Sequence, residues 1–99
     1  MSYVIFEVKK EETGKINTVL KDDLISRQSI TTRDANSLDI KGEATYLKIE
    51  GNVDALKKAE EMAKELGFIK LKEKEAKDIN EKIESQDDSA ASGMGMIFD

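Results

Sequence analysis

Residues 3–8 alternate in a way that predicts a β-strand. Val4, Phe6 and Val8 fall on one side of an extended chain, and Ile5 falls on the other. The run is also rich in β-branched and aromatic residues, which are common in strands. Because both sides carry apolar residues, we expect a central strand whose two faces are both covered.

A second strand is predicted over residues 44–50. Leu47 and Ile49 point one way and Tyr46 and Lys48 the other, again with a period of two residues. This strand is also expected to contribute to the core through Leu47 and Ile49.

The strongest helix prediction covers residues 53–66. Asn52 is a favourable N-cap, and Gly67 stands where a left-handed C′ residue ends a helix. The expected core face consists of apolar residues at helical spacing, namely Val53, Leu56, Ala59, Ala63 and Leu66.

An earlier helix is predicted over residues 13–24. Its apolar stripe consists of Ile16, Val19, Leu20 and Leu24. Asp22 and Asp23 lie at its C-terminal end, where the helix dipole disfavours negative charge, so the helix should end early or fray there.

The segment between these elements predicts a hairpin. Residues 25–33 are polar and β-branched, which favours an edge strand, and residues 34–37 have turn chemistry. The return strand is expected to pass through Leu38 and Ile40 and to break or bulge at Gly42. Residues 68–71 are predicted to form a last short strand.

The resulting order, βαββαβ, is the ferredoxin-like arrangement of a four-stranded antiparallel sheet with two helices on one face. We therefore expect one α+β domain over residues 1–71. Residues 72–85 are expected to form a charged helix that docks lightly or not at all, because its apolar stripe is narrow: Ala76, Ile79 and Ile83. Residues 86–99 are expected to be a flexible tail.

Composition narrows the possible functions. The chain has 99 residues, 38% of them hydrophobic and 37% charged, which is typical of one globular domain. Cysteine and histidine are absent, which removes thiolate chemistry and the commonest catalytic base and metal ligand. We expect no cofactor.

Charge and hydropathy also bear on partners and location. The formal net charge of −5 and the mixing of Lys with Glu disfavour nucleic acid and membrane surfaces as partners. No apolar run is long enough to span a membrane, and the opening residues lack a signal peptide. We therefore expect a cytoplasmic protein.

Part of the chain resembles a known family. The run IKGEATYLKIEG from Ile40 to Gly51, followed by Asn52, Val53, Ala59 and then Leu66, Gly67 and Phe68, resembles NIL domains and, more loosely, ACT domains. The resemblance spans residues 3–71. NIL domains accompany transporter ATPases or ferredoxin modules, and ACT domains accompany metabolic enzymes and bind amino acids or related effectors, commonly across paired domains. The resemblance therefore implies an effector-binding role with a partner chain, and it assigns no ligand-contacting residue.

One candidate metal site lies in the hairpin turn. Asp34, Asn36 and Asp39 offer three oxygen ligands within six residues, as hard cations such as Ca²⁺ and Mg²⁺ prefer. The spacing departs from a calcium-binding EF-hand loop because Asp39 stands where Gly is required and Thr45 replaces the closing Glu. A plain turn with solvated acids is the competing interpretation.

Two further candidate sites concern other ligands. The polar residues expected to line an effector pocket are Ser26, Arg27, Gln28 and Ser29, although a polar edge strand has the same pattern. A partner-binding segment at the end of the chain is suggested by flexible and aromatic side chains, namely Met94, Met96, Ile97 and Phe98.

These observations favour a non-enzymatic regulatory or adaptor module that binds a small effector or a partner protein. A homodimer or another protein would bind through the open sheet face or the C-terminal segment. The alternative is a cation-binding domain that uses residues 34–39. An enzyme is a third class, for which carboxylates, lysines and tyrosines remain.

Overall fold

The sheet forms around β1 (Ser2–Val8), which pairs along its whole length with β3 (Thr45–Gly51). The computed structural model describes residues 2–98, with side chains as far as residue 86. The outer strands are β2 (Ser29–Asp34), which pairs with β3, and the two-residue β4 (Ile69–Lys70), which pairs with β1. All these pairings are antiparallel, and the order is β2-β3-β1-β4. The protein is thus an α+β protein, compatible with a ferredoxin-like fold.

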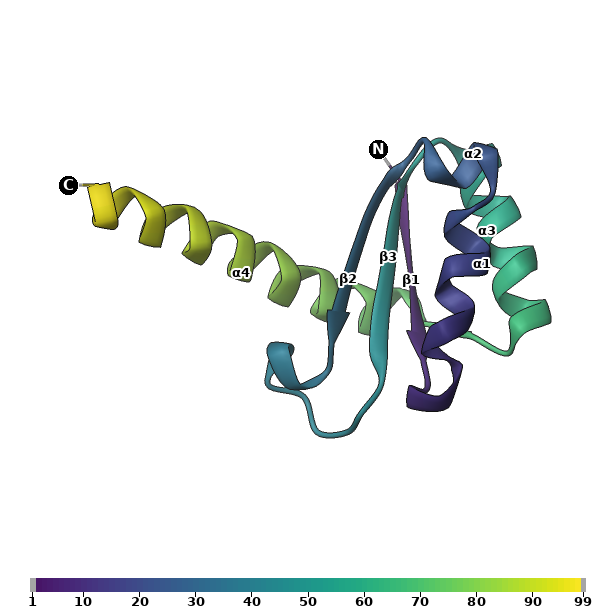
Figure 1. Ribbon diagram of the computed structural model, residues 1–99, viewed down its shortest axis with the longest axis horizontal. Coiled ribbons are helices and arrows are strands. Elements are labelled where there is room, and N and C mark those ends of the chain that lie inside the picture. The colour runs from purple at the N-terminus through teal and green to yellow at the C-terminus, as the bar shows by residue number, and fades with distance from the viewer. Residues whose placement is uncertain (1, 99) are drawn as a thin grey trace.

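Each face of the sheet packs against helices. On one face lie α1 (Ile16–Leu20), α2 (Asp23–Ser26) and α3 (Val53–Leu66), and on the other lies α4 (Glu73–Phe98) (Figure 1). The first core cluster contains Phe6, Leu47 and Ile49, whereas the second contains Ile5 and Tyr46. The predicted alternation of both central strands is therefore confirmed.

Helix α4 corrects the expectation of light docking. Ile79 and Ile83 are 8% and 1% exposed, and they belong to the second core cluster with Ala76. They cover Ile5, which is fully buried. The narrow apolar stripe is sufficient because it contacts an apolar strand face that needs cover.

The predicted helix over residues 13–24 is divided. A 3-10 helix, η1 (Lys10–Lys15), leads into α1, and a new helix, α2, begins after Asp22. The Asp22 carboxylate accepts hydrogen bonds from the main-chain N–H groups of Leu24 and Ile25 at 3.0 and 3.1 Å. The acid thus lies at the N-terminus of α2, where the helix dipole favours it.

The start of the predicted strand over residues 25–33 is wrong because of this cap. Ile25 is helical and fully buried, and the strand begins only at Ser29. The β-branched residues Ile30, Thr31 and Thr32 lie in β2, as predicted.

The return path through Leu38 and Ile40 is also different from the prediction. Leu38 belongs to a 3-10 helix, η2 (Asn36–Leu38), and packs with Ala35 in the second core cluster. The returning chain first pairs with the β2 side of the hairpin at Ala44, next to β3, where the Ala44 carbonyl accepts from the Ala35 N–H at 2.8 Å. Burial of Leu38 under the sheet overrides the strand pattern.

Helix α3 has the predicted ends. The Asn52 side chain accepts from the Ala55 N–H at 2.9 Å, and Gly67 adopts φ 82°, a left-handed conformation that glycine tolerates. Val53 corrects the predicted core face, since it is 55% exposed. As the first helical residue it points outward, and the buried stripe begins at Ala55 and Leu56.

Helix α4 extends past the β2 edge of the sheet (Figure 1). Its backbone is helical through most of the segment 86–99 that we expect to be a flexible tail. Mobility of that segment in solution stays a prediction.

Truncation of either buried leucine on the first core face should destabilise the fold. Leu47→Ala and Leu56→Ala are each expected to lower the free energy of unfolding by about 2–5 kcal/mol, because the residues are 0% and 7% exposed. The exposed control Lys57→Ala should stay within about 0.5 kcal/mol. Urea denaturation followed by circular dichroism measures all three, and equal small effects would show that the core face is misassigned.

The docking of α4 is tested on the second face. Ile83→Ala should lower the free energy of unfolding by about 2–5 kcal/mol, since the side chain is 1% exposed against the sheet. Its exposed helical neighbour Lys82 serves as the matched control, with Lys82→Ala expected to stay within about 0.5 kcal/mol. An Ile83→Ala protein as stable as the control would mean that α4 adds nothing to the core.

Candidate functional site

The outer edge of β1 is only partly covered, because β4 is short. Phe6 pairs with Lys70 and Glu7 with Ile69, and the Leu71 N–H donates to the Ile5 carbonyl at 3.0 Å. After Leu71 the chain turns into α4. The part of the edge nearer the N-terminus, residues 2–4, therefore has no neighbouring strand within the described part of the chain.

Tyr3 presents the main-chain groups of this uncovered part. The N–H and C=O of one strand residue point to the same side, and this side alternates along the strand. Since the Ile5 carbonyl points toward β4, the Tyr3 N–H and C=O point outward as well. Among the described residues neither group has a main-chain partner on that side.

A shallow depression continues from this edge. It has a volume of about 380 Å³, and its apolar lining includes Ile5, Leu71 and Ala76. Its polar lining comes from Ser2, Lys70 and Glu73. Residues 2–5 carry no charge, whereas exposed sheet edges commonly carry charged residues or proline that prevent pairing.

The Tyr3 ring lies in a field of carboxylates. Burial raises the pKa of Tyr3, and the nearby Glu84, Glu81, Glu73 and Glu50 raise it further. Lys48, only 8% exposed, places its ammonium 5.3 Å from the centre of the ring. The phenol therefore stays protonated at neutral pH, and one cation already binds its ring.

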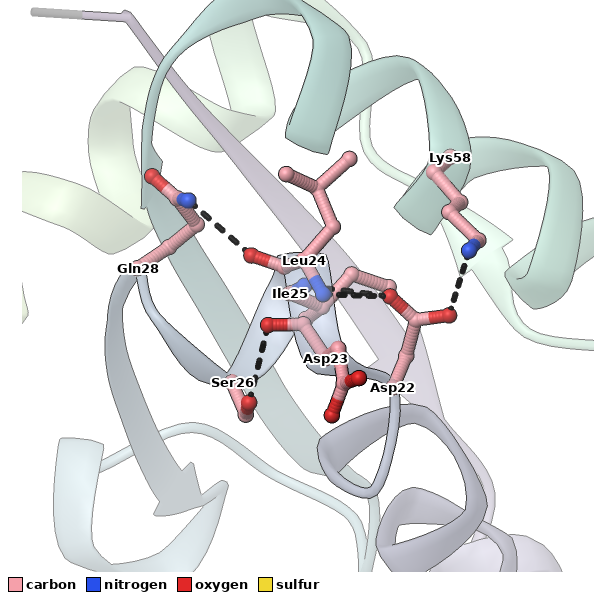
Figure 2. Close-up of polar contacts among 7 residues, drawn as sticks. All are labelled: Asp22, Asp23, Leu24, Ile25, Ser26, Gln28 and Lys58. Carbon is pink, nitrogen blue, oxygen red and sulfur yellow. Dashed lines mark hydrogen bonds and ion pairs between the residues drawn. The ribbon is translucent and has the colours of Figure 1, made fainter.

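The four predicted effector-binding residues do not form a single pocket lining. Ser26 and Arg27 end α2 at the surface, and the Ser26 hydroxyl donates to the Asp23 carbonyl at 3.1 Å (Figure 2). Of the four, Gln28 lines a shallow depression of about 560 Å³, together with residues that include Gly51. Ser29 is exposed at the start of β2.

Gln28 is bound to the protein's own main chain. Its Nε2 donates to the Leu24 carbonyl at 3.0 Å (Figure 2), and its Oε1 accepts from the Asn52 N–H at 3.3 Å. A Cβ on Gly51 would overlap this side chain, which accounts for glycine there. Gln28 thus joins the start of β2 to the start of α3, and it is not free to contact a ligand.

The neighbouring Asp22 and Asp23 have different environments. One Asp22 oxygen lies 2.7 Å from the Lys58 ammonium on α3, and the Asp23 carboxylate points away from Lys58 (Figure 2). The hydrogen bond from Lys58 lowers the pKa of Asp22, and Asp22 in turn raises the pKa of Lys58. Asp22 therefore does not have the raised pKa that two close carboxylates would give each other.

The candidate cation ligands lie at the end of β2, at the start of η2 and directly after η2. Asp34 ends β2, Asn36 begins η2, and Asp39 follows in a left-handed conformation with φ 59°. Across the described residues, no group of three or more Asp, Glu, His or Cys is placed to hold a metal ion. The predicted set includes an asparagine, so it stays a prediction.

The hairpin connection between β2 and β3, residues 35–44, also contacts α4. The Gln86 side chain donates to the Ser37 carbonyl and accepts from Arg33 Nε at 3.3 Å. These contacts border a depression of about 430 Å³ whose acidic lining comes from Asp39, Asp78 and Glu81.

The last candidate set lies outside the described side chains. Met94, Met96, Ile97 and Phe98 belong to the helical backbone of α4, and their predicted role in binding a partner stays a prediction.

Comparison of the chain with protein-family models, with curated proteins and with solved structures finds no match. Among the residues that the structure describes, no helix is both long and apolar enough to cross a membrane.

Sequence reasoning did not identify the uncovered β1 edge. The sequence pattern places Tyr3 in the first strand, Leu71 in the last strand and Glu73 in the helix after it, and it indicates no site at any of them. The available signal was the shortness of the last predicted strand, residues 68–71, opposite a first strand of six residues. That mismatch in length leaves part of the longer strand unpaired.

Acid titration tests the contact between Asp22 and Lys58. The folded-state pKa of Asp22 lies below its ordinary value of 3.8, so the contact stabilises the fold above that pH. The contribution is lost as the pH falls through the folded-state pKa. Asp22→Asn keeps a capping side chain and removes the charge. The advantage of the wild type over Asp22→Asn in urea midpoint should therefore be present at pH 7 and shrink as the pH falls below 3.8.

Asp23→Asn is the control, because the Asp23 carboxylate is exposed and points away from Lys58. Its difference from the wild type should change much less with pH. A wild-type advantage over Asp22→Asn that stays constant down to low pH would contradict the assignment.

Proposed function

We propose that this protein is a non-enzymatic adaptor or regulatory module that binds an extended segment of a partner protein along the uncovered edge of β1. The observation that carries the proposal is the outward-pointing main chain of Tyr3 beside an open depression of about 380 Å³. An extended segment added to a sheet edge gains main-chain hydrogen bonds, and its side chains supply specificity through adjacent pockets.

The four groups with a shifted pKa support a role without catalysis. General acid–base catalysis favours a pKa near the working pH. The pKa shifts of Asp22, Lys58, Tyr3 and Tyr46 all move away from neutrality. Each of these groups therefore keeps one protonation state at neutral pH, as structural groups do.

The partner-protein interpretation is favoured over a small effector. The residues first expected to bind an effector are exposed or, in the case of Gln28, hydrogen-bonded within the protein. The depression beside Tyr3 is open to the surface and continues the line of β4. This shape suits an extended peptide better than a small effector, which usually binds in a pocket that encloses it. The ferredoxin-like fold and the resemblance to NIL and ACT domains remain part of the proposal. No contact among the described residues favours the cation-binding alternative.

A neutral peptide tests this function. We expect acetylated Thr-Val-Met-Val-Thr, at millimolar concentration, to shift the Tyr3 and Ile5 amide signals in nitrogen–proton spectra more than those of Ile30 and Thr32 on the β2 edge. Tyr3→Pro removes the outward N–H and should weaken binding by about threefold to tenfold relative to Tyr3→Ala, which removes the ring alone.

Thr32→Pro is the edge control. The β2–β3 register directs the main-chain groups of Thr32 outward on the opposite edge, so this change should leave peptide binding unaltered. Shifts at the β2 edge instead of β1, or no shift with any peptide, would contradict the proposed function.

A further inference from the structure

The side chains around the uncovered edge of β1 are mostly carboxylates, and they favour a positively charged side chain on a bound segment. Glu50 lies directly opposite Tyr3 in the β1–β3 pairing, and directly paired residues share one face of the sheet. Glu73 lines the depression on the other side of β1. An incoming residue opposite Tyr3 would therefore point to the α4 face, next to Glu73 and across Tyr3 from Glu50.

Two of the positive charges at this place, those of Lys48 and Lys70, are already engaged. Lys48 lies over the Tyr3 ring and is almost fully buried, and the Lys70 ammonium forms an ion pair with Glu60. Glu81 and Glu84 of α4 add to the negative field that Tyr3 experiences. Lys77 lies one helical turn from both Glu73 and Glu81 on α4. Counted with Lys48, it leaves the four carboxylates around Tyr3 in excess, and a cation from a partner would balance them.

Resting on the proposed function, we infer that the partner is a basic extended segment that places Lys or Arg opposite Tyr3, with apolar residues on both sides of it. The basic side chain lies beside the Glu73 carboxylate, and the Tyr3 ring separates it from Glu50 on β3. Its apolar neighbours point to the opposite face, beside Val4, which is 4% exposed in the first core cluster. The pattern is apolar–basic–apolar, and its length matches the uncovered residues 2–4.

A second copy of this chain is disfavoured by the same charges. Pairing of two uncovered edges about a two-fold axis through Tyr3 would place Glu73 of both copies on the same face of the joined sheet, on either side of the paired Tyr3 residues. Like charges placed face to face across an interface cost free energy, and this cost opposes the wrong partner. The carboxylates that attract a basic segment therefore repel a homodimer through this edge.

The test compares peptides that differ at one position. Acetylated Thr-Val-Lys-Val-Thr should bind about threefold to tenfold more tightly than Thr-Val-Met-Val-Thr at low salt, and Thr-Val-Glu-Val-Thr should bind more weakly than both. Affinity is measured from the Tyr3 and Ile5 amide shifts. The preference for lysine over methionine should shrink as salt rises, because rim charges are screened.

Variants of the protein assign the preference to named carboxylates. Glu73→Gln and Glu50→Gln should each reduce the preference for the lysine peptide while leaving the methionine peptide unchanged. Glu43→Gln, on the distant hairpin connection, is the matched control and should keep the full preference. Circular dichroism confirms that each variant is folded.

The outcomes separate the two proposals. If the three peptides bind the β1 edge equally, the proposed function stands and the inference about charge is overturned. If no peptide shifts the Tyr3 and Ile5 amides, both are overturned. If sedimentation shows a dimer that Tyr3→Pro abolishes, the occupant is a second copy and the basic segment is rejected.

Discussion

Burial of β1 on both of its faces is the constraint on which the rest of the structure depends. Ile5 and Phe6 are adjacent, point to opposite faces and are 0% and 1% exposed. One layer of helices cannot cover both. Full burial of each such side chain contributes roughly 1.5–3 kcal/mol, so neither face can be left open at low cost. Helix α4 and the hairpin connection therefore form a second core rather than an appendage.

The elements that could be predicted from the sequence are those with local signals. The alternation in β1 and β3 identified both strands and their inward faces, and Asn52 and Gly67 marked the ends of α3. In each case the physical cause lies within a few residues of the element itself. Alternation and capping residues can therefore be interpreted without knowing how the rest of the chain folds.

The elements that could not be predicted depend on contacts between distant residues. Leu38 has the spacing of a strand residue, but it is buried beneath the sheet by contacts that its neighbours do not encode. Asp22 carries a local signal for a helix start, and it was interpreted as the unfavourable end of the preceding helix. The docking of Ile83 follows from the need to cover Ile5, which lies at the other end of the sequence.

The candidate site shows the same division. Gln28 is polar and near an edge strand, as a ligand-binding residue would be, yet its hydrogen bonds join two turns of the protein. The uncovered edge at Tyr3 arises because β4 has two residues and the chain then turns into α4. The residues near Tyr3 in the sequence do not indicate that this part of β1 lacks a neighbouring strand in the described part of the chain.

The position of α4 late in the chain has a consequence during synthesis. About 30 residues separate the end of β3 from Ile83, so a ribosome adding roughly 5–20 residues per second needs about 2–6 s to supply them. During that interval β1 and β3 can pair, but Ile5 and Tyr46 lack the cover that α4 provides. The nascent chain then exposes an apolar sheet face, and this is the period in which a chaperone would bind it or in which it would aggregate.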